Sequence, residues 1–235
     1  MIARSVVPAI AALLLAGCEF SNTPTGPTRH ETQSVELDKS EMARVELRMG
    51  AGDLNIKGGS SKFVEADFTY NVDSWKPEFR YTNTGVRGDL IIEQPSHGKV
   101  HTGTTNYIWD LRFNDEKPID LTVKFGAGDA HLNLGSMSLR SLDIGIGVGE
   151  LKLDLRGNPK RSYDARIRGG VGEATIYLPK DAGIEADAQG GIGGINARGL
   201  RKEGGRYVND IYDSAKTKIH LNIRGGVGEI NLIAE

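Results

Sequence analysis

Five acidic residues occupy the same place in a recurring glycine signature, and their side chains are the ones best suited to chemistry. Each follows a G-x-G triplet directly, and they are Asp53, Asp129, Glu150, Glu173 and Glu229. Carboxylates gathered in one row bind Ca²⁺, or act as a proton-transferring pair on a polysaccharide. Either site needs acids that neighbouring cations do not already neutralise.

Cations recur at a fixed offset from these acids. Five residues before four of the acids stand Arg48, Lys124, Arg168 and Arg224. The fifth acid has a glycine at that offset, and a sixth signature has neither acid nor cation. The pattern favours charge compensation across the corner, for example between Arg168 and Glu173, over a metal or catalytic site. Exposed pairs of this kind contribute only about 0–1 kcal/mol each. We therefore expect no catalytic residue, no metal and no cofactor.

Other catalytic and metal-binding patterns are weak. His97 and His101 share a loop without a third ligand in reach, which is more typical of solvated histidines than of a metal site. The sequence has no Gly-x-Ser-x-Gly elbow for a nucleophile. Phosphate-binding glycine loops lead into a helix, whereas strand patterns follow the glycines here. Calcium-binding nonapeptide repeats have a much shorter period.

Aromatic side chains offer a second kind of candidate site. Trp75 precedes Lys76 and Pro77 in a loop, and Tyr207 and Tyr212 lie in a polar stretch near the C-terminus. These three residues are candidates for a surface that binds a sugar or a protein. Tyr107 and Trp109 share one face of an expected strand with further apolar residues, so we expect them in the core.

The N-terminus resembles a bacterial lipoprotein signal. A positive start is followed by a short apolar run from Val6 to Ala16, too short to span a bilayer, which needs about 20 residues. The run ends in Leu-Ala-Gly-Cys, with Cys18 as the only cysteine of the chain. We expect cleavage before Cys18 and attachment of lipid to its sulfur, which would hold the protein on a membrane of the cell envelope. Which membrane and which leaflet stay open.

Charge and composition limit the partners and the domain plan. The net charge of −2 makes nucleic acid an unlikely partner for this chain. Residues 1–17 are predicted to be the signal peptide. Residues 18–34 are polar and broken by Pro24, Gly26 and Pro27, so we expect a flexible tether. The folded domain is expected to span residues 35–235.

A glycine signature organises that domain. The chain has 31 glycines, above the usual share of about 7%. Six copies of the signature begin at positions 50, 126, 147, 170, 191 and 226. Three of the steps lie near 22 residues, which is typical of a solenoid period.

The residues around each signature predict strands with a corner. Apolar residues alternate before the glycines, as at Ile144, Ile146 and Val148, and in the opposite phase after them, as at Leu151 and Leu153. Val171 and Val227 continue the inward row in their own copies. A one-residue slip in an alternating pattern indicates a bend that glycine permits. The predicted corner glycines are Gly52, Gly128, Gly149, Gly172, Gly193 and Gly228.

The predicted fold is therefore an all-β solenoid with glycine-cornered rungs and almost no helix. Residues 119–235 hold the regular repeats. Residues 58–118 are expected to form an irregular β subdomain or wider rungs continuous with the solenoid, and residues 199–218 are a second insertion before the last rung. The handedness of the solenoid and the oligomeric state are left open.

The ordered set of motifs resembles the bacterial toast-rack family, which is related to the C-terminal domain of cell-wall-active antibiotic response proteins and to adhesin-type domains. The resemblance covers roughly residues 38 to 235. It is carried by the G-x-G-[DE] rungs together with residues 50–56, 76–79, 106–111 and 118–121. Departures are Gly194 in place of the acid and the long final insertion. The resemblance implies a membrane-tethered β-solenoid without established enzymatic activity.

Three functions follow as expectations. The first is a non-enzymatic scaffold, adhesion or interaction module of the cell envelope with a protein or glycan partner. The second is an accessory component of an envelope-stress sensing system, by analogy with the antibiotic-response relatives. The third, which the paired charges disfavour, is a β-helix enzyme acting on polysaccharide.

Overall fold

The computed structural model describes residues 25–95 and 104–235, and their regular structure is almost entirely strand. In the N-terminal half the strands are β1 (Arg29–Val35), β2 (Met42–Lys57), β3 (Val64–Tyr70), β4 (Glu78–Asn83), β5 (Arg87–Glu93), β6 (Tyr107–Phe113) and β7 (Ile119–Asn133). They are followed by β8 (Leu139–Asp154), β9 (Tyr163–Leu178), β10 (Gly183–Gln189), β11 (Ile195–Arg198), β12 (Arg201–Glu203), β13 (Arg206–Val208), β14 (Lys218–Arg224) and β15 (Ile230–Ala234). Within the described ranges, the helical structure is a single 3₁₀ turn, η1 (Asp73–Trp75).

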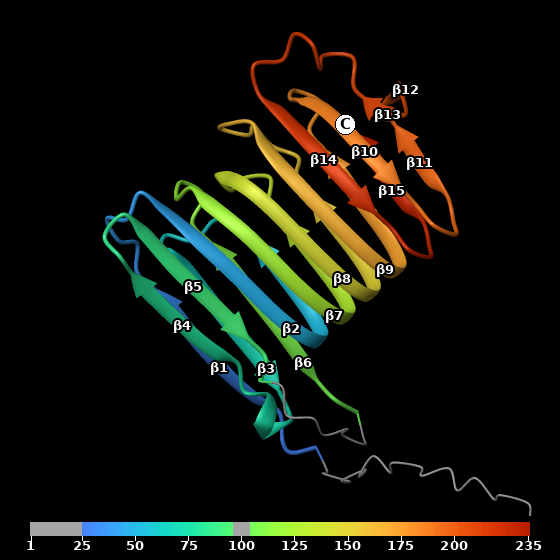
Figure 1. The fold of residues 1–235 in the computed structure, drawn as a ribbon. Coiled ribbons are helices and arrows are strands. Elements are labelled where there is room, and N and C mark those ends of the chain that lie inside the picture. Colours follow the sequence, from blue (N-terminus) through green and yellow to red (C-terminus); the bar gives the residue numbers. More distant parts are fainter. Residues whose placement is uncertain (1–24, 96–103) are drawn as a thin grey trace, which may run out of the picture.

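Four long strands bend in the middle and give the molecule two legs. Strands β2, β7, β8 and β9 have 15 or 16 residues each. Their halves before the bend form the first leg, in the order β4-β5-β2-β7-β8-β9-β14-β10-β13-β12. Their halves after the bend form the second leg, in the order β1-β3-β6-β2-β7-β8-β9-β15-β11. Figure 1 shows the long strands side by side, turning over at one common edge.

Parallel pairing holds the bends in line. Gly52 pairs with Gly128, Gly128 with Gly149, and Gly149 with Gly172. Inward side chains alternate with outward ones on both legs, and the inward ones form one continuous core, which includes Leu47 and Leu54 on either side of the first bend. The predicted solenoid of stacked, glycine-cornered rungs is thus the fold of the protein.

The rungs do not stack in chain order. Strand β14 lies between β9 and β10, and β15 lies between β9 and β11. The signature at Gly226 therefore stands between those at Gly170 and Gly191 (Figure 1). Residues 199–218, with the β12–β13 hairpin, carry the chain out from the end rung so that it can return one place earlier.

Residues 58–118 extend both legs at the N-terminal end. The antiparallel β4–β5 hairpin continues the first leg beside β2, and β3 and β6 continue the second leg. This region is continuous with the repeats and shares their core.

The tether predicted for residues 18–34 is wrong over its last part. Arg29–Val35 form β1, which pairs antiparallel with β3 along its whole length. Its side chains are polar because it is an edge strand with one face toward solvent, while its backbone satisfies the edge of β3. The predicted signal peptide and Cys18 lie outside the described residues. Among the residues that are described, no helix has the length and apolarity to cross a membrane.

Candidate functional site

Glycine is required at the bend of every rung. The six predicted corner glycines all have φ between +125° and +141°, a region that other residues rarely adopt. A Cβ added to Gly172 would lie 1.8 Å from the carbonyl oxygen of Gly149 in the neighbouring rung, and Gly228 would meet Gly172 at 1.7 Å. The bends lie where the phase shift predicts them. Both the backbone angle and the close approach of the neighbouring rung exclude a side chain at these positions.

The residue between the two glycines lies at the apex of the bend and is exposed in five of the six rungs, whereas Ala51 is half-buried. In order along the rack these residues are Ala51, Ala127, Val148, Val171, Val227 and Ile192, which we call the corner ridge. The exposed fractions are 53% for Val148, 50% for Val171, 44% for Val227 and 75% for Ile192. Our expectation that these valines continue the inward row is wrong, because the bend turns this one position outward. The sequence signal that could have predicted this outward turn is an aliphatic residue placed between two glycines.

The acids flank the ridge on the second leg, and the predicted compensation across the corner is wrong. Glu150 pairs instead with Lys152, at 2.7 Å, which lowers the pKa of Glu150. Glu173 accepts hydrogen bonds from Asn231 at 2.9 Å and from Thr175 at 3.4 Å. Sequence offset misled here because a cation three residues before the apex and an acid two residues after it lie on different legs.

The cations of the first leg pair with acids of the same leg, most of them in a neighbouring rung. Arg168 meets Asp143 at 2.7 Å and Arg224 meets Asp187 at 2.8 Å. Lys124 and Arg48 both bind Glu46, at 2.8 and 2.9 Å.

Glu46 is the acid most strongly affected by these contacts. Hydrogen bonds from Arg48 and then Lys124 outweigh its partial burial and lower its pKa to about 2.

A small hollow lies beneath the ridge. The inner position before the bend holds Met49, Phe125 and Ile146 in three rungs, but glycine in the other three. Around Gly169, Ala174 and Gly225 the missing volume leaves a hollow of about 40 Å³ with mainly apolar walls. That is room for about one water molecule, so it is a packing defect and not a ligand cavity.

The three candidate aromatic residues do not form one surface. Trp75 is half-buried and its ring meets that of Tyr107 edge to face, at 5.5 Å between centroids. Tyr207 also packs partly against the core, with Lys202 over its ring. Tyr212 lies beside His220 and beneath Lys218. Trp75 is at the N-terminal end of the rack and the two tyrosines at the other, so a shared binding face is excluded.

The predicted core positions of Tyr107 and Trp109 are confirmed, since they are 3% and 0% exposed.

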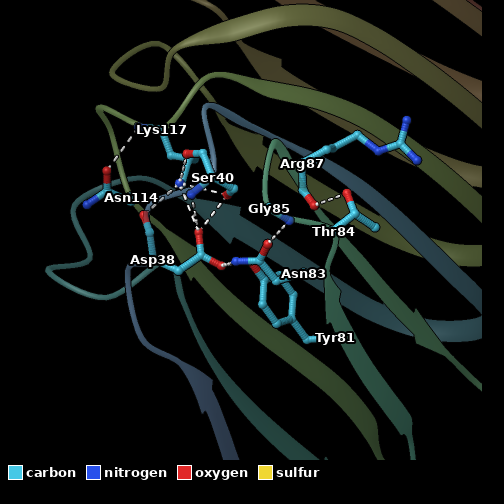
Figure 2. Close-up of polar contacts among 9 residues, drawn as sticks. All are labelled: Asp38, Ser40, Tyr81, Asn83, Thr84, Gly85, Arg87, Asn114 and Lys117. Carbon is cyan, nitrogen blue, oxygen red and sulfur yellow. Dashed lines mark hydrogen bonds and ion pairs between the residues drawn. The ribbon is translucent and has the colours of Figure 1, made fainter.

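A buried lysine organises the N-terminal end, and no sequence signal pointed to it. Figure 2 shows Lys117 reaching Asp38 and Ser40, with Tyr81 and Asn83 on the other oxygen of Asp38. Burial alone raises the pKa of Asp38, but the hydrogen bonds from Ser40, Tyr81 and Lys117 outweigh it and hold the pKa well below its usual range. Burial, and then Asp38, raise the pKa of Tyr81 to about 12.

This buried cluster ties the segment before β2 to β4 and to the loop before β7. All its members satisfy one another, so the cluster fits a structural role.

Metal chemistry finds no support in the described ranges. No group of three His, Cys, Asp or Glu residues within residues 25–95 and 104–235 is placed to hold a metal ion. His97 and His101 lie outside the described residues. His220 lies between Asp164 and Tyr212, at 3.3 Å from each, on the exposed face of the first leg.

Fold and corner together define a class of protein: an open two-legged β-rack whose rungs turn at stacked glycines. The chain belongs to the toast_rack family, because the model of the family's N-terminal domain matches residues 24–177. The model of the C-terminal domain of LiaF, a cell wall-active antibiotics response protein, matches residues 126–232. The two matches overlap, in agreement with one continuous rack.

One solved structure agrees with this assignment. A protein from Clostridium sporogenes described as a putative cell adhesion protein is 35% identical to this chain, with a TM-score of 0.84. The match covers 89% of this chain and all of that one. A putative adhesin from Bacteroides fragilis is 9% identical over 90% of this chain and all of its own, with a TM-score of 0.35, too low to support any argument. No curated protein matches the chain.

Proposed function

We propose that the protein is a lipid-anchored interaction module of the bacterial cell envelope, acting in adhesion or as a scaffold and not as an enzyme. The 35% identical structural relative is described as a cell adhesion protein of putative status. The fold of this family places outward side chains of successive rungs in rows with fixed register. Neighbouring rungs in such a row are about 4.8 Å apart. Such rows suit the display of a binding surface.

The observation that carries the proposal is the corner ridge. Monomeric soluble proteins rarely expose large contiguous apolar patches. Where such a patch occurs, it marks an interaction site. Four of the six large apolar side chains found exposed in the described residues lie on this one ridge. Two of the acids beside it, Glu150 and Glu173, are engaged in an ion pair or in hydrogen bonds.

The anchor is proposed from the Leu-Ala-Gly-Cys sequence ending at Cys18. Cys18→Ser should abolish incorporation of radiolabelled palmitate and move the protein from the membrane fraction to the soluble fraction. A variant that still labels and sediments with membranes would remove the anchor from the proposal.

Adhesion is tested with beads that carry the purified chain. We expect the beads to bind bacterial envelope preparations and to lose most of that binding when Val148, Val171 and Ile192 are changed together to Ser. A triple change of the exposed residues Leu37, Lys57 and Val86 to Ser is the control, because it alters surface residues away from the ridge. Release of new reducing ends from envelope polysaccharide by the chain would favour an enzyme instead.

A second candidate function is supported by the LiaF-like match over residues 126–232. Here the protein is an accessory component of an envelope-stress sensing system. Deleting it should then change the response of a cell-envelope stress reporter to a wall-active antibiotic. If the deletion strain loses adhesion but its stress reporter responds as in the parent, the interaction module alone is favoured.

A further inference from the structure

We propose that the corner ridge is a self-association surface, on which two copies of this chain pack side by side with a two-fold axis parallel to the ridge. The proposal rests on the proposed function and deepens it, because it names a second copy of this chain as the partner that covers the ridge.

The ridge does not serve the core of its own chain. Along the rack the residue at the apex grows from Ala51 and Ala127 through three valines to Ile192. The inner position before the bend shrinks in the same direction, from Met49 and Phe125 to glycine. Apolar volume is therefore moved from inside the corner to outside it, and the hollow under Val171 and Val227 is left unfilled. A partner that covers the ridge gives the exposed volume a place to be buried.

The two flanks of the ridge carry different charges. On the first leg the flank has the cations Arg48, Lys124, Arg168 and Arg224, and on the second leg it has the five acids. All four cations meet acids of their own leg, but their side chains stay partly exposed, from 37% for Arg224 to 62% for Lys124. One flank can therefore attract the other.

This charge arrangement selects one orientation. When two ridges face each other and run parallel, a two-fold axis along the ridge places the cation flank of each copy against the acid flank of the other. When the ridges run antiparallel, like flanks meet and repel. The parallel arrangement sets Arg168 of one copy opposite Glu173 of the other, and repeats that contact on the opposite side of the axis.

The parallel arrangement also places both N-termini at the same end. Two copies held by lipid on one membrane would meet this requirement. Six rungs at about 4.8 Å give a ridge of roughly 24 Å, which buries less than the roughly 800 Å² per partner of a standard interface. The contact is therefore expected to be weak in dilute solution and to form at the high effective concentration of a membrane surface.

Single cysteines on the ridge test this arrangement. The full chain, expressed in bacteria, receives Ala127→Cys, Val171→Cys or Ile192→Cys and is treated with a short bismaleimide. The parent chain, with Cys18 alone, sets the background. We expect each ridge position to link to itself in at least fivefold higher yield than Val86→Cys, which is 61% exposed but off the ridge. Efficient self-linking at both ends of the ridge requires parallel copies.

Charge exchange supplies the second measurement. Arg168→Glu or Glu173→Arg alone should lower the Ile192→Cys yield at least threefold, and the double variant should restore it. Melting temperatures of all variants verify that they fold, and these exposed positions tolerate the changes. Equal yields at Val86→Cys, self-linking only at mid-ridge, or linkage of the ridge cysteines to a different protein would each overturn the proposal. The palmitate test does not depend on that outcome. Bead binding that is lost in the ridge variant, without any self-linking of the ridge cysteines, would keep the interaction module and remove only the self-association.

Discussion

The inner column of the second leg differs between the two ends of the rack. At the N-terminal end it runs through Phe68, Trp109 and Leu54, all almost fully buried. Three rungs beyond Leu54, the same column holds Ala174, next to the hollow, and then Ile230. The N-terminal end of the column is therefore filled by large aromatic side chains, whereas the C-terminal rungs have aliphatic side chains and a gap at Ala174.

Polar contacts follow the same division. The N-terminal end has the buried Lys117, with four acceptor atoms on Asp38 and Ser40. The C-terminal rungs carry their charges on exposed faces, as in the Arg168–Asp143 pair. The same fold thus tolerates two kinds of interior as long as the glycine corners stack.

The largest expected effect concerns the stacked glycines. Gly172→Ala places a Cβ 1.8 Å from the oxygen of Gly149 at a φ of +141°. We expect it to lower the free energy of unfolding by more than about 3 kcal/mol, since backbone strain and overpacking add. Chemical denaturation measures the loss. Gly145→Ala is the matched control, because its Cβ meets nothing within 4 Å, and a similar loss there would contradict the stacking argument.

Removing a large buried side chain at the N-terminal end should lower the free energy of unfolding by nearly as much. Trp109→Ala removes the largest fully buried side chain and should cost about 3–5 kcal/mol, a range typical of such truncations. Denaturant titration of the variant and of the parent gives the difference. If Leu151→Ala, in the same column near the hollow, cost more than Trp109→Ala, the proposed division between the ends would be wrong.

Breaking the buried cluster should have an intermediate effect. Lys117→Met leaves Asp38 and the carbonyl of Ser40 without their buried donor and should cost about 1–3 kcal/mol. Lys62→Met removes a more exposed lysine that pairs with Glu36 and should change stability by less than about 0.5 kcal/mol. Thermal melts of both variants at pH 7 give the comparison.

Filling the hollow should stabilise the C-terminal end. A Cβ on Gly169 meets nothing within 4 Å, whereas on the adjacent Gly170 it would lie 2.3 Å from the oxygen of Gly147. Gly169→Ala should therefore raise stability by about 0.4–1 kcal/mol, by restricting the unfolded chain. Gly170→Ala should lower it. Opposite signs for two neighbouring glycines, measured by denaturation, would confirm that the defect is local.

A similarly small effect is expected from the pH dependence of the pair network on the first leg. The pKa of Glu46 falls from 4.5 to about 2 in the folded protein. Because the pKa of Glu46 is lower in the folded than in the unfolded protein, its ionisation stabilises the fold at pH values above about 4.5. This contribution is lost as the pH falls from about 4.5 toward 2. The parent should exceed Glu46→Gln by about 1 kcal/mol at pH 7, the upper end for exposed pairs, and the gap should close at pH 2. A gap that persists at pH 2 would exclude the ion pairs as its cause.

The corners could be predicted from sequence because their cause is local. A phase shift at G-x-G records both the bend and the side on which each leg buries its apolar row. The outward turn of Val148 was missed because alternation alone does not show which residue sits at the apex. The partners of Arg168 and Arg224 were missed because they lie in neighbouring rungs, at distances that depend on strand pairing.

Rung order could not be predicted for the same reason. The 35-residue step before Gly226 indicates an insertion in the chain but not where the returning strand will pair. Lys117 gave no signal, since its acceptors Asp38 and Ser40 are 79 and 77 residues away. Long-range polar contacts leave no local pattern.

The interleaved order of the last rungs constrains how the chain can fold. Strand β10 is synthesised before β14, yet its parallel neighbour in the finished sheet is β14. As the chain emerges from N- to C-terminus, β7, β8 and β9 can each be added to a neighbouring strand that is already present. The end of the rack must wait, because β10 and β11 gain their places only after the last 18 residues, from Lys218 onward, have arrived. The final segment therefore completes the sheet between β9 and the strands β10 and β11. A chain that lacks this segment loses its own rung and the rung of β10 and β11.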